Sequence, residues 1–199
     1  MDKIDKEIFK KLYKLPKNSH KGQNGKLMII GGSKLFHGAS LWALKTASRI
    51  VDMVFYSTVK ENEELTKKLK SEIYDFICVP RQDIDSYIQE SDAILIGCGM
   101  ERGEQHLTKK EWEEDTFRVT KHLLAKFPDK KWIIDAGSLQ MMEKKWLKQL
   151  SQVIITPHLK EFSKLFGFMT GEIKKLEIKK LRRLVSRTAK EFRCTIVLK

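Results

Sequence analysis

Two kinds of segment alternate along this chain. Short, nearly continuous runs of Ile, Leu, Val and Phe are separated by longer segments in which apolar residues recur every three or four positions. Short apolar runs are typical of strands covered on both faces, and the longer periodicity is typical of amphipathic helices. The pattern therefore predicts an alternation of strands and helices in one domain.

The apolar runs define the strands that we expect: residues 26–33, 52–59, 72–79, 92–99, 131–138, 152–158 and 194–199, the last as a central strand. The periodic segments define the helices: residues 38–49, 61–70, 84–90, 104–127, 144–150, 159–167 and 171–193. Such alternation predicts an α/β fold, with a mostly parallel central sheet and helices on both faces. The sequence stops at Lys199, where the last strand reaches its carboxyl end. We expect either a protein that ends on a strand or a fold whose C-terminal part is missing from this sequence.

The composition agrees with a globular protein. Hydrophobic residues make up 41% and charged residues 33% of the 199 positions, and no apolar run is long enough to cross a bilayer. The charged N-terminus does not resemble a secretory signal. Cys78, Cys98 and Cys194 are widely separated and lack metal-ligand spacing. We expect a cytoplasmic protein with no membrane partner and no metal site.

The net charge of +13 raises the alternative of nucleic-acid binding. Much of the excess lies at residues 171–193, where apolar residues with helical spacing leave Lys and Arg largely on the opposite face. No nucleic-acid module is present in the sequence. We therefore expect a solvated basic face that attracts anionic ligands, and no nucleic-acid partner.

At four predicted strand ends, apolar residues give way to small or polar residues just before a helix. These ends read IIGGSKLFHGAS (29–40), ILIGCGME (94–101), IIDAGSL (133–139) and IITPHLKE (154–161). Glycine lets the backbone approach a ligand closely, and the start of a helix offers unpaired N–H groups to an anion. In a parallel sheet these ends share one edge, which predicts a crevice for a phosphate-rich ligand.

Most of these corners also have a purely local explanation. Gly32 and Ser33 fit a tight turn in which Ser33 caps the next helix, and Gly99 fits a simple bend of the backbone. Asp135 either meets a partner or a cation, or takes part in helix capping around Ser138.

His158 is the sharpest candidate. Pro157 cannot join the hydrogen-bond ladder, so the strand must end there and leave the imidazole at the start of a helix. An imidazole in that position can donate to a phosphate or to a ribose hydroxyl near neutral pH. The alternative is a structural histidine whose hydrogen bonds are satisfied within the protein.

Two longer blocks have the form of family motifs. The first, K-G-x-x-G, an apolar strand and G-G-S-x-x-[YF]-x-G-A, is present as Lys21-Gly22, Gly25, LMII, Gly31-Gly32-Ser33, Phe36 and Gly38-Ala39. The second, T-P-H-x-x-E-F-x-x-L-x-G, is present as Thr156, Pro157, His158, Glu161, Phe162, Leu165 and Gly167. With these blocks the sequence resembles the ADP/ATP-dependent NAD(P)H-hydrate dehydratases, which have a ribokinase-like fold. The resemblance implies a domain at residues 21–199, preceded by an N-terminal extension at 1–20.

The resemblance also implies a function. Such enzymes are hydro-lyases that repair NADH or NADPH whose nicotinamide ring has been hydrated, NAD(P)HX. They phosphorylate the ring hydroxyl with ADP or ATP, with a divalent cation such as Mg²⁺, and then expel phosphate. By this resemblance the hydrated cofactor contacts Ala39, Gly99 and His158, Lys199 begins the nucleotide phosphate loop, and relatives suggest a homo-oligomer. The wider set of substrate-binding candidates adds Gly32, Ser33, Gly38 and Asp135.

The sequence departs from the family pattern in places. Cys98 replaces a proline, Glu101 stands where a glycine is usual, and Gly137 replaces the second aspartate of D-A-D. The G-[TS]-G-D motif, with the family's catalytic aspartate, does not occur and would lie beyond Lys199. We therefore expect no catalytic residue within these 199 positions. Two other functions stay open: a ribokinase-like kinase of a vitamin precursor, and a non-catalytic nucleotide-binding module.

Overall fold

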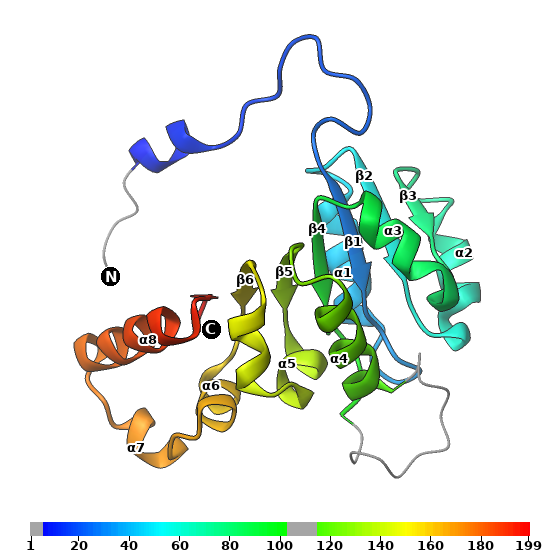
Figure 1. The fold of residues 1–199 in the computed structure, drawn as a ribbon. Coiled ribbons are helices and arrows are strands. Elements are labelled where there is room, and N and C mark those ends of the chain that lie inside the picture. The colour runs from blue at the N-terminus through cyan, green and yellow to red at the C-terminus, as the bar shows by residue number, and fades with distance from the viewer. Residues whose placement is uncertain (1–5, 103–114) are drawn as a thin grey trace.

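The computed structural model of the chain describes residues 6–102 and 115–199. In these residues seven parallel strands form one sheet, in the order β3-β2-β1-β4-β5-β6-β7 (Figure 1). The strands are β1 (Lys26–Ile30), β2 (Met53–Ser57), β3 (Phe76–Cys78), β4 (Ala93–Ile96), β5 (Lys131–Ile134), β6 (Gln152–Ile155) and β7 (Thr195–Ile196). The chain runs outward from β1 to β3 and then returns to β4 on the other side of β1, so the order reverses between β1 and β4.

Helices cover both faces of the sheet. The α-helices are α1 (Gly38–Ala47), α2 (Glu63–Leu69), α3 (Ile84–Glu90), α4 (Thr116–Lys126), α5 (Ala136–Met141), α6 (Leu159–Phe166), α7 (Thr170–Lys174) and α8 (Ile178–Phe192). Short 3₁₀ helices add η1 (Lys6–Lys11), η2 (Lys60–Asn62), η3 (Arg81–Asp83) and η5 (Lys144–Gln149). The predicted α/β alternation and the parallel sheet are confirmed.

Alternating side chains of each strand enter two separate cores. Met28 and Ile30 of β1 point into the larger core, which is closed by α3 to α6 and by Phe192 of α8. Ile29 points the other way, into a smaller core under α1 and α2. Because side chains of a strand alternate between its faces, an unbroken apolar run can fill both cores.

The smaller core covers only part of its face. Ile29 is in register with Leu95, Ile133 and Ile154 across neighbouring strands. Ile29 is fully buried, whereas Ile154, three strands away, is 38% exposed. The face under α1 is therefore closed over β1 and β2 and open to solvent over β6 in the described residues.

The last predicted strand is shorter in the described residues. Residues 194–199 read as a central strand, but among the described residues β7 is two residues long and lies at the sheet edge, with Thr195 and Val197 exposed. The predicted helix at 171–193 is two helices, α7 and α8, separated at residues 175–177. Of the predicted helix at 104–127, α4 covers 116–126, and residues 103–114 lie outside the described residues.

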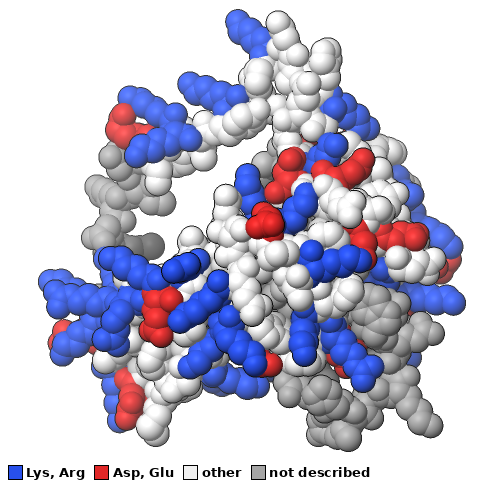
Figure 2. Space-filling model, in the orientation of Figure 1, with Lys and Arg blue, Asp and Glu red and all other residues white. Residues whose placement is uncertain are grey.

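The C-terminal helix α8 has the solvated basic face that the sequence predicted. Lys and Arg side chains of α8 are exposed, while Leu181, Leu184 and Val185 pack against the larger core. Figure 2 shows these basic side chains gathered over α8, at the lower left of the view. The basic face is therefore solvated.

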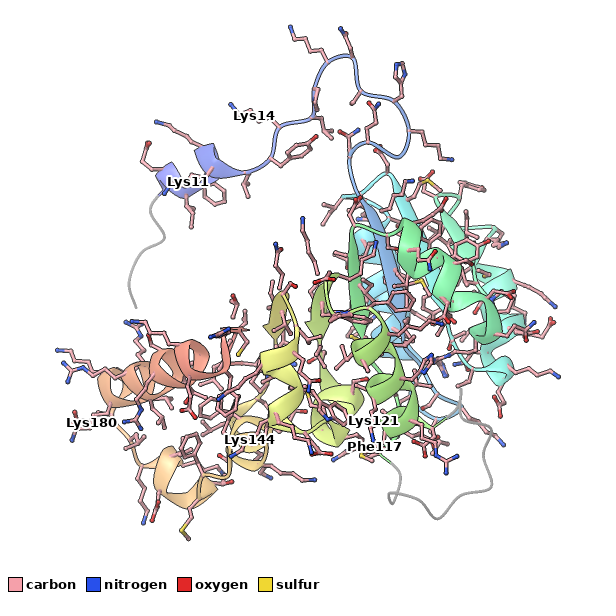
Figure 3. The ribbon with its side chains drawn as sticks, in the orientation of Figure 1. Lys11, Lys14, Phe117, Lys121, Lys144 and Lys180 are labelled. Carbon is pink, nitrogen blue, oxygen red and sulfur yellow. The ribbon has the colours of Figure 1, made fainter. Side chains whose placement is uncertain are left out.

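Residues 6–20 lead away from the sheet, and Lys11 and Lys14 project from this segment (Figure 3). Its apolar side chains are largely exposed, Phe9 and Tyr13 among them. The assignment of residues 1–20 to an extension stays a prediction. No helix among the described residues has the length and apolarity that a bilayer crossing requires.

Candidate functional site

All four predicted corners lie at the carboxyl edge of the sheet, because every strand runs in the same direction. Ser33 follows β1, Gly99 follows β4, Asp135 follows β5 and His158 follows β6. The edge also includes the reversal point between β1 and β4, where ligands bind in doubly wound sheets.

The glycines at this edge serve contacts within the protein. Gly32 has φ 77° and donates its N–H to the Cys98 carbonyl at 2.7 Å. A Cβ at Gly32 would lie 2.6 Å from Thr58 Oγ1, and a Cβ at Gly99, with φ 71°, would lie 2.0 Å from the Phe36 carbonyl oxygen. The loops after β1 and β4 therefore lie in close contact, and glycine is required at Gly99 by neighbouring backbone and at Gly32 by its positive φ and by neighbouring side chains.

The loop after β1 is held by side chains. Ser33 is buried, and its Oγ accepts a hydrogen bond from the Phe36 N–H at 3.0 Å. Asn62 donates to the Ser33 carbonyl at 3.1 Å. Of the local alternative for Ser33, the turn is present, but the cap is not, because α1 starts at Gly38 and its N-cap residue is His37. Gly38 and Ala39 are exposed at the start of α1.

Asp135 is the centre of a polar cluster that links the ends of four strands, β4 to β7. Its Oδ1 accepts from Thr156 Oγ1 at 2.6 Å and from Lys199 Nζ at 2.7 Å. Cys98 Sγ lies 3.6 Å from the other carboxylate oxygen. The carboxylate occupies the N-cap position of α5 but makes no cap hydrogen bond, and Ser138 is bonded to Thr120 instead. Asp135 therefore binds partner side chains and does not cap the helix, which is the first of the two alternatives that the sequence left open.

The cluster fixes the charge of its members. Burial raises the pKa of Asp135, but hydrogen bonds from Lys199 and Thr156 outweigh it, so the pKa of this carboxyl lies below its ordinary value. Burial, followed by the negative charge of Asp135, raises the pKa of the Cys98 thiol to about 12. Cys98 is therefore a neutral thiol at physiological pH, and Asp135 is a carboxylate.

His158 caps α6. Its Nδ1 accepts from the backbone N–H groups of Lys160 at 3.1 Å and Glu161 at 3.3 Å. Glu161 returns the contact by accepting from the His158 N–H at 2.8 Å, which completes a capping box. Nδ1 therefore has its hydrogen bonds within the protein, as expected for a histidine with a structural role. Nε2 is left as the donor, 3.4 Å from Glu161 Oε1, on a side chain that is 50% exposed.

A groove of about 730 Å³ lies between α5 and α6 beside His158. Its lining includes four cationic side chains, those of Arg102, Lys144, Lys160 and Lys164, and two carboxylates, those of Glu143 and Glu161. Figure 3 shows Lys144 in this part of the molecule. Of the predicted site residues, His158 alone lines the groove. The structure thus joins Asp135 to Lys199 and leaves His158 facing a separate recess.

Sequence reasoning missed two residues of this edge. Thr156 was quoted only as part of a motif, yet it holds Asp135. Glu161 completes the cap of α6, and the spacing H-x-x-E at 158–161 was a sufficient signal, because a capping box places a Glu three residues after the cap. The described residues contain no group of three His, Cys, Asp or Glu that could hold a metal ion.

The fold defines the class of protein. A ribokinase-like superfamily protein from Enterococcus faecalis V583 matches with a TM-score of 0.74 and 20% identity, over 98% of this chain and 65% of that one. An ADP/ATP-dependent NAD(P)H-hydrate dehydratase from Bacillus subtilis, co-crystallised with ATP/Mg²⁺, matches with a TM-score of 0.70 and 24% identity, over 94% and 62%. The chain has the ribokinase-like α/β fold.

Within this class the family is defined by sequence. Residues 27–199 match the NAD(P)H-hydrate dehydratase family, and the chain belongs to it. It is 34% identical over 158 residues to a bifunctional NAD(P)H-hydrate repair enzyme from Methanocaldococcus jannaschii, which is 77% of this chain and 30% of that protein. It is 30% identical over 193 residues to an ADP-dependent (S)-NAD(P)H-hydrate dehydratase from Nitrosopumilus maritimus, which is 91% of this chain and 61% of that protein. The chain thus spans less than two thirds of the length of these relatives.

Proposed function

We propose that the chain supplies the carboxyl-edge site of an ADP- or ATP-dependent NAD(P)H-hydrate dehydratase, a hydro-lyase that returns hydrated NADH or NADPH to the reduced cofactor. The observation that carries the proposal is the family match over residues 27–199, in a chain whose T-P-H block and G-G-S block lie at one edge of a parallel sheet. Relatives from Nitrosopumilus maritimus and Caenorhabditis elegans are named for ADP- and ATP-dependent forms of this reaction.

The dinucleotide binds at the edge loops in this proposal. Ala39 is exposed at the start of α1, and His158 offers Nε2 as a donor from its half-exposed ring. Gly99 acts indirectly, by letting the loop after β4 pack against Phe36. Gly32, Ser33 and Gly38 shape the neighbouring loop.

The phosphate chemistry lies nearer to Lys199. Its ammonium group is half exposed at the carboxyl edge and is positioned by Asp135, which is in turn held by Thr156. A cation fixed in this way neutralises the charge of a nucleotide phosphate without reorganising when the phosphate arrives. The neutral Cys98 thiol adds no negative charge next to the phosphate.

ADP or ATP would supply the phosphoryl group that turns the ring hydroxyl into a leaving group, and Mg²⁺ would accompany its phosphates. Mg²⁺ is commonly held by one or two carboxylates together with substrate phosphates. Asp135 would offer one such carboxylate, mostly buried at the edge and next to the cation that faces the phosphates.

The test is an absorbance assay. The polypeptide encoded by the gene that carries residues 1–199 is incubated with hydrated NADH or NADPH, Mg²⁺ and either ADP or ATP. The expected result is recovery of the reduced-nicotinamide absorbance that depends on the nucleotide. No recovery with any of the four combinations, or a stable phosphorylated small molecule as the only product, contradicts the proposal.

We further propose a cytoplasmic homo-oligomer that binds no nucleic acid and no membrane. Trp42 and Ile50 support self-association, because they are 76% and 71% exposed and lie on or just after α1. Light scattering after gel filtration checks this, and a monomer at micromolar concentration contradicts it. Nucleic-acid binding that weakens steeply with salt would contradict the second part.

A further inference from the structure

A second cavity lies at the carboxyl ends of β2 and β3, outside the residues assigned so far. Its volume is about 480 Å³, within the range of small-molecule sites. Its lining residues are Tyr56, Thr58, Val59, Lys60, Glu63, Thr66, Lys67, Lys70, Cys78, Val79, Pro80, Arg81 and Gln82. The cavity therefore lies on the same sheet edge as the candidate site, toward β3.

The charge of this cavity is strongly unbalanced. Four cationic side chains line it, those of Lys60, Lys67, Lys70 and Arg81, and Glu63 is the one carboxylate in the lining. Lys67 is paired with Glu64 at 2.8 Å, outside the lining. Lys60 and Lys70 are exposed on either side of α2. An anion in the cavity thus meets several cations within a small, partly enclosed volume.

The inner wall of the cavity is apolar. Tyr56 is 1% exposed and Val79 is 3% exposed, so both are fixed parts of the core. The Tyr56 hydroxyl is bonded to Ser40 at 2.9 Å, which holds the ring in place. An apolar wall with a rim of cations suits a ligand that carries both a flat ring system and a phosphate.

The cavity adjoins the glycine corner. Thr58 lines the cavity, and its Oγ1 is the atom that a Cβ at Gly32 would approach to 2.6 Å. Asn62 links the two, donating to Thr58 Oγ1 at 3.0 Å and to the Ser33 carbonyl at 3.1 Å. One ligand that extends along the edge can therefore reach from the loop after β1 into the cavity.

We propose that this cavity binds the phosphate-bearing adenosine end of the dinucleotide and selects the 2′-phosphorylated form, hydrated NADPH, an inference that rests on the proposed dehydratase function. In doubly wound folds a carboxylate accepts the ribose 2′-hydroxyl of NAD, whereas an arginine accommodates the 2′-phosphate of NADP. Arg81 lies three residues after β3 and lines the cavity, where the four cationic side chains outnumber the carboxylate of Glu63.

The test measures binding by calorimetry, without turnover. The probes are NADPH, NADH, 2′,5′-ADP, 5′-AMP and 5′-ADP, and the variants are Lys60→Gln and Lys70→Gln. Lys68→Gln is the matched control, because Lys68 is exposed on α2, carries the same charge and does not line the cavity. The native chain should bind NADPH and 2′,5′-ADP about tenfold more tightly than NADH and 5′-AMP, as expected for one charge-assisted phosphate contact.

Lys60→Gln and Lys70→Gln should each reduce that preference, and Lys68→Gln should keep it. Equal binding of NADPH and NADH by the native chain, or equal losses in all three variants, overturns the inference. Loss of 5′-ADP binding with NADPH binding unchanged also overturns it, because the cavity would then belong to the nucleotide co-substrate.

The cavity assignment and the dehydratase function can fail independently, and the experiments distinguish the two failures. Repair of hydrated NADH and NADPH with the same KM contradicts the cavity assignment and leaves the dehydratase function intact. A preference for 2′,5′-ADP that Lys60→Gln removes, without repair of either hydrated cofactor, supports the cavity and contradicts the dehydratase function.

Discussion

The two ends of the sheet's carboxyl edge are built differently. On the β6–β7 side the polar groups are already paired, with Asp135 bonded to Thr156 and Lys199. On the β2–β3 side, exposed lysines surround a cavity with an apolar inner wall. The first arrangement fixes charges in place, whereas the second leaves cations available to a ligand. In the proposed function, the β6–β7 side therefore holds charges next to the nucleotide and the β2–β3 side contributes affinity for the dinucleotide.

Between the two ends, the loops after β1, β4 and β5 pack closely on one another. The largest expected effect comes from breaking this packing. Gly97→Ala places a Cβ 1.9 Å from the Asp135 carbonyl oxygen at φ 112°, so the backbone must shift. We expect a loss of about 3 kcal/mol or more in the free energy of unfolding, measured with denaturant.

Gly171→Ala in α7 is the matched control, because nothing lies within 4 Å of its added Cβ. It should leave the free energy of unfolding unchanged or raise it slightly, since alanine favours a helix more than glycine does. Equal stability of the two variants would show that the edge loops are not packed as described.

The next largest effect tests the paired side of the edge. Asp135→Asn removes the negative partner of Lys199, and we expect a loss of about 1–2 kcal/mol of stability at neutral pH. The pKa of Asp135 is lowered from 3.8 by folding, so its contribution is present above that pH and is lost as the pH falls below it. Calorimetric melting should therefore show the native chain and the variant converging below about pH 4. A constant difference down to pH 2 would contradict the ion pair.

His158 tests whether the cap and the ligand contact can be separated. His158→Ala should cost about 1 kcal/mol through loss of the α6 cap. His158→Asn should restore the cap, because asparagine is a good N-cap residue, but it lacks the Nε2 donor. We expect Asn to keep the melting temperature and still weaken binding of hydrated NADPH several-fold. Full binding by His158→Asn would assign the histidine to structure alone.

The smallest expected effect concerns the relative rates at which two thiols, those of Cys78 and Cys98, are alkylated. Burial raises the pKa of Cys98 from 9.0 to about 12, so its thiolate fraction at pH 8 is about a thousandfold below that of an ordinary thiol. Burial also raises the pKa of Cys78, which lines the cavity, but nearby Lys70 opposes that shift. Iodoacetamide at pH 8 should alkylate Cys78 before Cys98, as followed by mass spectrometry. The reverse order would show that the paired side of the edge opens to solvent.

Much of the fold followed from the sequence because the parallel sheet depends on local patterns. Apolar runs and turn residues placed the strands, and the shared strand direction brought the corners to one edge. Residues 194–199 have the apolar pattern of a longer strand, whereas β7 covers two residues in the described part of the chain. The break between α7 and α8, at residues 175–177, could not be predicted from the sequence because it contains no glycine or proline.

The site was less predictable for a related reason. Thr156 and Lys199 are 21 and 64 residues from Asp135, so their contact exists only once three strands lie side by side. The sequence left a ligand contact and a local turn open for Gly32 and Gly99, and the crowding of both positions by neighbouring backbone and side chains is visible only in the fold. The cavity after β2 and β3 had no motif, because its cations come from η2, from α2 and its C-cap, and from η3.

Hydrogen exchange with and without hydrated NADPH locates the ligand on the molecule most directly. We predict slower exchange in residues 31–39, 58–63, 97–100 and 156–160, all at the carboxyl edge. A groove of about 690 Å³ at the opposite edge, lined by Lys131, Gln152 and Lys190 among others, provides the internal comparison and should exchange as before. Protection confined to that groove, or spread evenly over both edges, would contradict a binding site at the carboxyl ends of the strands.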